Sequence, residues 1–413
     1  MLLTASSVSA QEDPSFRYPP PEFETGHELP ADNQAPAREG WKETTDIVLL
    51  AVFLAVASWL VLKKRSRKGV VFLSVCALVY FGFYRMGCIC AIGAVQNVAL
   101  GLADASYTVP AGAVFFFALP LLFTLFFGRS FCAAVCPHGA IQDAVALKPI
   151  KVPLRLERIL AIIPWLYLGL AVFLAVTDTM FIICTYDPFV SLFRLSGGFL
   201  ILLFGGGLMV TGIFIARPYC RFLCPFGVLL GLVSRISRHS VSITPDECIQ
   251  CGLCEDSCPV GAICTPGLKK SVSTKAKYLI LSACIVITAG STAAGYRIGA
   301  ALSVCNREVG LGRKLENNIS PDVGSEDLEI QAIAKNRLSR ESLIARAELM
   351  ENRFAKGGLW LGAWLGIGIS VIIMGSARRR EYKDYQPDPA RCVSCARCYT
   401  YCPRSRDKEK SDD

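Results

Sequence analysis

Long apolar stretches alternate along the chain with short polar or charged segments. Several are long enough to cross a hydrocarbon core of roughly 30 Å, and seven are predicted to be membrane spans. They cover about Ile47–Leu62, Gly69–Tyr84, Val109–Phe127, Ile159–Val176, Gly198–Ala216, Tyr278–Ala294 and Gly358–Gly375. This pattern predicts an all-α polytopic membrane protein with about seven transmembrane helices.

Basic clusters beside these stretches predict an orientation. Lys63–Lys68, Lys148–Arg158 and Arg378–Arg380 follow the first, third and seventh stretch. Because such clusters mark the cytoplasmic side, we expect a multi-pass protein of the bacterial cytoplasmic (inner) membrane with its N-terminus outside and its C-terminus in the cytoplasm. Residues 1–10 resemble the end of a secretory signal, which predicts a truncated signal remnant; a frayed N-terminus is the alternative.

The same pattern divides the chain into segments. We expect an extracytoplasmic arm at 11–45, a membrane domain at 46–240, the sixth helix at 277–298, an extracytoplasmic loop at 299–356, the seventh helix at 357–376, and two halves of a ferredoxin unit at 241–270 and 385–413. Within the loop, a charged stretch near Asp327–Phe354 predicts a solvated helix, with a docking surface as the alternative.

Two cysteine runs share the spacing C-x2-C-x2-C-x3-C followed by proline, which is typical of bacterial [4Fe–4S] ferredoxins. In two-cluster ferredoxins the fourth cysteine of a run binds the other cluster. A zinc site or disulfides are the alternatives, although zinc spacing lacks the third C-x2 step and the Cys-Pro ending. The runs therefore predict two [4Fe–4S] clusters in a small ferredoxin-like unit on the cytoplasmic face. The predicted iron ligands are Cys248, Cys251, Cys254, Cys258, Cys392, Cys395, Cys398 and Cys402.

An internal repeat supplies four more thiols. Arg129-x-Phe-Cys-x3-Cys-Pro-x-Gly matches Arg217-x-Tyr-Cys-x3-Cys-Pro-x-Gly, each at the inner end of a helical pair. The repeat predicts two helical hairpins packed about a pseudo-twofold axis. The four thiols could hold a third iron–sulfur centre, or they could be buried packing residues that brace the ferredoxin unit. They are Cys132, Cys136, Cys220 and Cys224.

Three cysteines are predicted to gather at the outer face: Cys88, Cys90 and Cys184. They could form a redox or metal site, or a disulfide in an oxidising compartment. Cys88 and Cys90 are too close in sequence to bridge each other, so a disulfide would involve Cys184 or Cys305. The remaining cysteines, Cys76, Cys264 and Cys284, carry no motif, and those within spans are expected to be packing residues.

Some charged residues lie beside these motifs. Asp143, Asp187 and Arg194 fall near membrane ends, where they are functional if intramembrane or else reach the interface. His138 could tune a cluster through a hydrogen bond to sulfur, but we favour a surface position.

Several classes of function are excluded. None of the three histidines lies inside a predicted span, so we expect no haem; no GxGxxG or Walker loop is present, so we expect no nucleotide. The net charge of +9 is spread in short clusters beside membrane stretches, which does not predict a nucleic-acid partner.

The Arg-x-aromatic-Cys-x3-Cys-Pro-x-Gly repeats together with the ferredoxin runs resemble the NosR/NapH-type membrane polyferredoxins. The resemblance covers about residues 45–265 and adds the run at 392–403. It implies a protein that passes electrons between a quinol or cytoplasmic donor and an extracytoplasmic redox partner, with the eight cysteines of the runs as cluster ligands. NosR-like proteins carry an external flavin-binding domain, whereas this chain has only an arm and a loop, so an FMN-binding partner could be a separate chain.

We therefore expect a membrane-embedded electron-transfer subunit of a larger complex rather than a stand-alone enzyme. One alternative is an assembly factor that reduces a metal for a respiratory enzyme. Another is a subunit of a redox-driven ion pump. A pump should carry acidic residues deep in its spans, and the span limits given above contain none.

Overall fold

The computed structural model describes residues 40–403 except 88–89, 106, 148, 244–247, 268–272, 307–308, 311, 314–315, 317–339 and 378–381. The predicted signal remnant, most of the predicted arm, Cys88, and much of the predicted outer loop lie outside the described residues. The described residues form two compact units, one within 40–295 and 359–403 and the other within 296–358.

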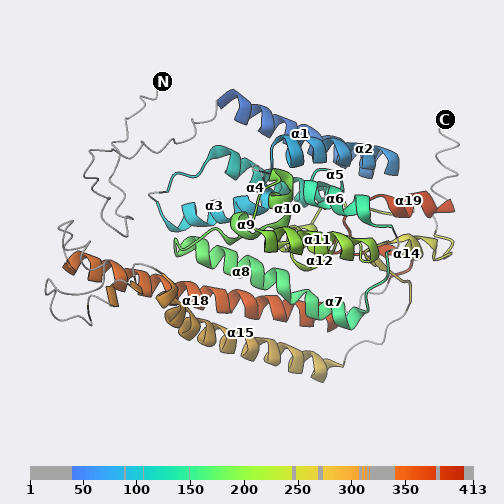
Figure 1. The fold of residues 1–413 in the computed structure, drawn as a ribbon. Coiled ribbons are helices and arrows are strands. Elements are labelled where there is room, and N and C mark those ends of the chain that lie inside the picture. Colours follow the sequence, from blue (N-terminus) through green and yellow to red (C-terminus); the bar gives the residue numbers. More distant parts are fainter. Residues whose placement is uncertain are drawn as a thin grey trace, which may run out of the picture. The chain divides into compact units, whose positions relative to one another are not determined.

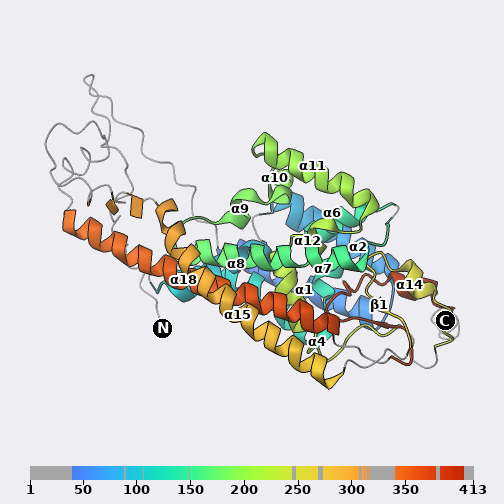
Figure 2. The same ribbon diagram turned by 90° about the horizontal axis from the view of Figure 1, so that it is seen from below.

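Helices make up most of the described chain (Figures 1 and 2). The first half contains α1 (Gly40–Leu62), α2 (Arg67–Ala77), the π-helix η1 (Leu78–Tyr84), α3 (Ala91–Ala103), α4 (Ala111–Phe127), α5 (Ser130–Ala134), α6 (Pro137–Val145), α7 (Leu154–Leu160), α8 (Ile162–Val176) and α9 (Ile182–Tyr186). The second half contains α10 (Pro188–Arg194), α11 (Phe199–Phe214), α12 (Pro218–Phe222), α13 (Pro225–Ser234), α14 (Leu253–Ser257), α15 (Thr274–Leu302), α18 (Arg340–Ala377) and α19 (Arg397–Tyr401), with two short strands, β1 (Ile263–Cys264) and β2 (Gln386–Pro387).

Five helical segments of the described chain are long and apolar enough to cross a membrane, or six if the bent pair α10–α11 is one span. Each of the seven predicted stretches coincides with helix, but two fail as simple spans. The 17 residues of α4 reach only about 26 Å at 1.5 Å per residue. Helix α11 is bent by 104° against α10. These spans support a membrane protein, and the predicted number of seven stays a prediction.

Helix α18 differs from the predicted loop and seventh span. It has 38 residues and runs without interruption from Arg340 to Ala377. The part of the predicted solvated helix that is described, from residue 340 onward, is therefore the first half of the same helix that carries the seventh apolar stretch.

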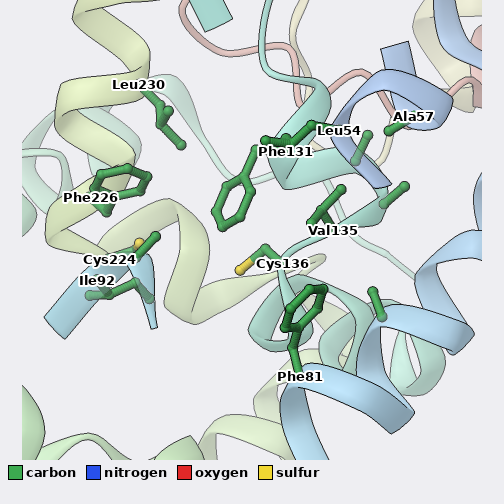
Figure 3. Packing of buried hydrophobic residues seen from close by; sticks show 14 of the residues in the cluster. Leu54, Ala57, Phe81, Ile92, Phe131, Val135, Cys136, Cys224, Phe226 and Leu230 are labelled. Atoms are coloured by element: carbon green, nitrogen blue, oxygen red, sulfur yellow. The ribbon is translucent and has the colours of Figure 1, made fainter. Parts of the chain in front are cut away.

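The core of the larger unit lies among α1, α4, α5, α8 and α13. Leu54 and Phe81 are almost completely buried. Figure 3 shows Cys136 and Cys224 among apolar side chains that include Phe131 and Phe226. The centre of the helical bundle is thus where the two repeat motifs meet.

Helices α15 and α18 run side by side in both ribbon views (Figures 1 and 2). Small residues allow their backbones to touch: a Cβ on Gly362 would lie 2.1 Å from the carbonyl oxygen of Ser291. Further along, Thr288 and Ser370 place their hydroxyl oxygens 3.3 Å apart. Such close approach of small residues is a common way for membrane helices to associate.

We expect Gly362→Ala to destabilise this helix pair, because the new methyl group collides with backbone that cannot rotate away. Overpacking of this kind costs about 1–3 kcal/mol. Thermal unfolding in detergent measures it. Gly290→Ala on α15 is the matched control, since nothing lies within 4 Å of its added Cβ; equal unfolding midpoints for both variants would contradict the tight contact.

The smaller unit contains the end of α15, a 3-10 turn at Ser303–Cys305 and the beginning of α18. Val309, Ala347 and Phe354 are buried within it. An exposed ion pair joins Arg313 Nε to Glu351 Oε1 at 2.8 Å.

The two ferredoxin halves assemble into one unit although they lie far apart in sequence. Strand β1 pairs antiparallel with β2, with Ile263 opposite Pro387 and Cys264 opposite Gln386. The amide of Asp388 donates to the carbonyl oxygen of Ala262 at 2.8 Å. The short helices α14 and α19 pack against each other.

Candidate iron–sulfur sites

The two cysteine runs share a backbone conformation as well as a spacing. The residue before the second cysteine has a positive φ in both runs, 52° at Gln250 and 54° at Ser394, and so has the residue after it, 74° at Gly252 and 62° at Ala396. Three of these four are not glycine, so the conformation is strained. Strain of this kind is concentrated at ligand clamps.

Two cavities lie inside the ferredoxin unit, and each combines both runs. The first is lined by Cys248, Cys251 and Cys254 of the first run and by Cys402, the fourth cysteine of the second. The second is lined by Cys392, Cys395 and Cys398 of the second run and by Cys258, the fourth cysteine of the first. The structure therefore brings all eight predicted ligands together in two crossed groups of four.

The chemistry of these groups fits [4Fe–4S] clusters. All eight are free thiols. The backbone amides of Ser394 and Ala262 donate to Cys392 Sγ at 3.4 Å and to Cys258 Sγ at 3.3 Å. Hydrogen bonds to sulfur are one means by which a protein sets the potential of a cluster.

Burial raises the pKa of the Cys392 thiol to about 12 and that of Cys254 to about 11. Only the thiolate binds iron, so these protons must leave when a metal group binds. No set of three or more His, Cys, Asp or Glu side chains is arranged to hold a single metal ion within the described part of the chain. The four thiolates of a cube each bind a different iron, and they stand apart around it.

The four repeat cysteines form a further group in the core. Cys136 interacts electrostatically with the other three thiols, those of Cys220, Cys132 and Cys224. Polar donors point at two of the sulfurs: Gln142 Nε2 donates to Cys220 Sγ at 3.3 Å, and Arg129 Nη2 lies 3.7 Å from Cys132 Sγ. Cationic and amide donors suit a charged sulfur ligand better than an inert packing residue.

Each repeat places its arginine against the glycine of the other. A Cβ on Gly139 would lie 3.4 Å from Arg217 Nη1, and a Cβ on Gly227 would lie 3.7 Å from Arg129 Nη2. Each glycine therefore lies within van der Waals range of the guanidinium from the other repeat.

Arg217 connects the four-thiol group to the ferredoxin unit. It is almost completely buried and pairs with Asp143 through two hydrogen bonds, Nε to Oδ1 at 2.8 Å and Nη2 to Oδ2 at 2.7 Å. The same guanidinium donates to the carbonyl oxygen of Cys132 and interacts electrostatically with both Cys220 and Cys395. Asp143 therefore belongs to a buried network and does not reach for the interface.

The prediction of a surface position for His138 is wrong. His138 and Asp187 are each 1% exposed. His138 Nε2 lies 3.3 Å from Asp187 Oδ1, and the hydroxyl of Tyr219 donates to Asp187 Oδ2 at 2.6 Å. Asp187 also caps α10 by accepting from the amide of Phe189 at 2.8 Å. Burial is tolerated because each oxygen of this carboxylate has a donor.

A second buried carboxylate lies just outside the predicted limits of the first span. Helix α1 begins earlier than predicted and includes Asp46, which is 0% exposed. Asp46 accepts from the hydroxyl of Tyr80 at 2.8 Å and pairs with Arg85 at 3.1 Å. The predicted span limits contain no acidic residue, but the longer helix α1 that carries the first span does.

Of the three cysteines predicted for the outer face, two are described, and they lie near each other. Cys90 precedes α3 and interacts electrostatically with Cys184. The sulfur of Cys184 is 3.0 Å from where a Cβ on Gly93 would lie, in the first turn of α3. Arg194, by contrast, is exposed and donates through Nε to the carbonyl oxygen of Met86 at 3.3 Å.

The segments predicted to be cytoplasmic contact one another. Arg67 Nη1 donates to the carbonyl oxygen of Cys395 at 2.8 Å, and Arg65 lies over the ring of Tyr399. Lys151 pairs with Asp256 at 2.9 Å. The basic run after α1, the basic segment before α7 and both ferredoxin halves thus lie at one end of the larger unit.

Comparison with known protein families gives matches to iron–sulfur domains. A model described as a 4Fe-4S binding domain matches residues 109–155 and 197–244, which contain the two repeat motifs. A second 4Fe-4S binding domain model matches residues 241–264, which contain the first ferredoxin run. No solved structure matches the chain.

The chain is similar to YccM of Escherichia coli strain K12, an electron transport protein by its name. The two are 24% identical over 57% of this chain and 69% of YccM. The chain is 33% identical to the methylamine utilization ferredoxin-type protein MauN of Paracoccus denitrificans, over 36% of this chain and 54% of MauN. It is also 27% identical to the regulatory protein NosR of Pseudomonas aeruginosa, over 53% of this chain and 33% of NosR. The matched regions thus span less than two thirds of MauN and of NosR.

Proposed function

We infer from these homologues and 4Fe-4S domains that the chain belongs to the NosR/NapH-type family of 4Fe–4S membrane proteins. On that premise, we propose that it relays single electrons across the membrane. The coarse role, iron–sulfur electron transfer, agrees with the names of the relatives. The proposal adds a path: from a quinol or cytoplasmic donor, through the ferredoxin unit and the four-thiol group, to an extracytoplasmic redox partner.

One observation carries the proposal: the two crossed groups of four cysteines lie beside a third group of four in the membrane domain. Two cytoplasmic clusters alone could not move an electron across a hydrocarbon core of roughly 30 Å. A third group of thiols in the core of the bundle supports a path that continues into the membrane.

Iron–sulfur clusters bound at these sites would supply one-electron redox chemistry. The chain's own residues hold and tune them. Arg217 interacts electrostatically with both Cys220 and Cys395, which supports a role in coupling the two groups. Gln142 and Arg129 donate to sulfurs of the four-thiol group, and such hydrogen bonds favour the reduced, more negative state.

The proposed topology follows from the contacts at one end of the larger unit. The basic residues after α1, which favour a cytoplasmic position, touch the second ferredoxin half. This supports a cytoplasmic ferredoxin unit and a cytoplasmic C-terminus. Cys90 and Cys184 would then lie toward the outside, where an extracytoplasmic partner could receive the electron. An FMN-binding chain in the same membrane complex is one such partner.

The position of Asp46 also supports the alternative that the chain is a subunit of a redox-driven ion pump. Asp46 is buried in α1 and bonded to Tyr80 and Arg85, next to the π-helix η1, and π-helical turns occur frequently at functional sites. If protons move with the electrons, Asp46→Asn should abolish the pH change that accompanies turnover while electron transfer continues. A simple relay predicts the same pH change in both proteins, since it then comes only from the chemistry of the electron donor and acceptor.

Proteoliposomes with ferricyanide trapped inside test the relay directly. Dithionite added outside cannot cross the lipid, so bleaching of ferricyanide reports electrons carried by the protein. We expect Cys136→Ala to slow bleaching at least about tenfold, because it removes a ligand of the centre inside the bundle.

Reduction of the ferredoxin clusters by dithionite should be unchanged in the same Cys136→Ala protein, which separates crossing from entry. Cys76→Ala is the matched control, since Cys76 lies on α2 outside all three groups. Bleaching at the wild-type rate in Cys136→Ala would rule out a path through the four-thiol group.

A further inference from the structure

A separate cavity lies where the membrane helices meet the second ferredoxin half. One wall is apolar and comes from α8, α13 and α18, with Trp165, Val371 and Ile372 among its residues. Cys220 and Cys224 border it, and Val393 of the second run lies at its edge. The cavity is thus adjacent to the proposed electron path but is not one of the cysteine cavities.

The other wall of this cavity is strongly basic. Five arginines face two carboxylates. The charged residues are Arg129, Arg158, Arg221, Arg235, Arg391, Glu157 and Asp388. An excess of positive charge beside apolar helices attracts an anion.

The two carboxylates are already engaged. Glu157 accepts from Arg221 Nη2 at 2.8 Å through Oε1 and from Arg391 through Oε2. Asp388 accepts from the amide of Ala390 at 3.0 Å. They therefore neutralise only part of the arginine charge.

Two buried arginine nitrogens at this cavity have no hydrogen-bond partner among the described residues: Arg129 Nε and Arg221 Nη1. Arg129 is only 7% exposed, and the side chain of Arg221 only 10%. Buried N–H groups are almost always satisfied, and an unsatisfied one on a cation is costly. Each of these nitrogens has less than 1 Å² of accessible surface, so both lie behind the cavity wall. A ligand in the cavity would be attracted by the positive charge of these side chains rather than bound by these two donors.

We propose that the cavity binds the phosphate group of an anionic amphiphile, with the phosphate among its five arginines and the apolar chains along Trp165 and Ile372. Guanidinium groups match phosphate oxygens in geometry. Basic pockets between membrane helices bind anionic lipid headgroups in this way. Free phosphate has the same headgroup chemistry but leaves the apolar wall uncovered.

A bound phosphate would stabilise the contact between the second ferredoxin half and the membrane helices. Arg391 belongs to that half and already reaches Glu157, while Arg129 donates through Nη1 to the carbonyl oxygen of Ala390 at 2.9 Å. An anion among these arginines offsets their mutual repulsion. Lipid binding therefore stabilises the contact between the ferredoxin unit and the four-thiol group.

Thermal unfolding of the delipidated full chain in detergent tests this inference. The probes are phosphatidylglycerol, phosphatidylcholine with the same acyl chains, and inorganic phosphate. We expect phosphatidylglycerol to raise the unfolding midpoint saturably. Arg221→Gln should weaken its apparent affinity at least about tenfold, because it removes one positive charge from the cavity wall and leaves the Glu157 carboxylate less neutralised, so that it repels the phosphate.

Arg235→Gln is a second variant. Arg235 is exposed, and its replacement keeps the ion pairs of Glu157 with Arg221 and Arg391, so we expect it only to weaken phosphatidylglycerol binding severalfold. Arg155→Gln, exposed on the same helix as Glu157 but outside the cavity, should bind as the wild type does. An equal rise with inorganic phosphate would support the phosphate site and identify free phosphate as its occupant. An equal rise with phosphatidylcholine, no rise with any probe, or wild-type affinity in both Arg221→Gln and Arg235→Gln would overturn the proposal.

Discussion

Replacing Cys402 with alanine should remove the cluster of the first cysteine run, not that of its own run. Cys402 lines the cavity of Cys248, Cys251 and Cys254. A cube contributes four irons, so iron per chain should fall by about four. The EPR signal that disappears from the dithionite-reduced protein should be the one that Cys251→Ala also removes.

The reciprocal pair sharpens this experiment. Cys258→Ala should lose the signal that Cys395→Ala loses, because Cys258 lines the second cavity. Cys76→Ala serves as the control, with unchanged iron and unchanged signals. If Cys402→Ala and Cys395→Ala lost the same signal, each run would hold its own cube and the crossed arrangement would be wrong.

Replacing Arg217 with methionine should destabilise the larger unit by about 3 kcal/mol, because it leaves the partly buried Asp143 carboxylate without its bidentate partner. Arg67 stays only as a longer contact, 3.7 Å from Asp143. The free energy of unfolding in detergent measures the loss. Arg313→Met removes an exposed pair and should cost no more than about 1 kcal/mol.

The double variant Arg217→Met with Asp143→Leu provides the thermodynamic control. Removing both charges should recover part of the loss, since no unpaired carboxylate remains. A double variant whose loss in the free energy of unfolding exceeds the sum of the two single-variant losses would contradict a direct interaction between the two side chains.

The Arg217–Asp143 pair also predicts a dependence on pH. Burial alone would raise the pKa of Asp143, but Arg217 and then Arg67 outweigh it and hold the pKa below its usual value. The pair therefore stabilises the folded state above the unfolded pKa of about 3.9, and this contribution is lost as the pH falls through the folded pKa. Arg217→Met should lack this acid-dependent loss.

Local features of the chain were predictable because they depend on short spacings. The apolar stretches predicted helices, and each coincides with helix in the structure. The cysteine runs and the repeat predicted which thiols form groups, since the spacing alone places three cysteines of a run on one turn. The crossing of the fourth cysteine was expected from ferredoxin chemistry, and the lining of the two cavities agrees with it.

Buried polar residues were harder to predict, because their partners are distant in sequence. His138 follows a proline at the start of α6 and resembles a turn residue. Its burial involves Asp187 beside Nε2 and the stacked ring of Tyr219, both distant in sequence. The helix α3 was missed because Gln96 and Asn97 interrupt its apolar pattern. Gln96 is in fact 0% exposed, and it accepts from the amide of Ile183 at 2.9 Å.

The arginines of the repeat were visible in the sequence, but their role was not. Their equal placement before each Cys-x3-Cys-Pro motif was the only signal that could have identified them. A network such as Arg217 with Asp143 requires knowledge of which helices pack together. Spacing within one segment does not supply that knowledge.

The most direct test of the electron relay is the content of iron and acid-labile sulfide per chain in anaerobically purified protein, with EPR after dithionite reduction. Two cubes account for about eight irons, and a centre on the four repeat cysteines raises the count to about ten or more. We predict the higher count, with a signal that Cys136→Ala removes. A count of about eight would contradict the centre in the membrane domain, and zinc in place of iron would contradict electron transfer altogether.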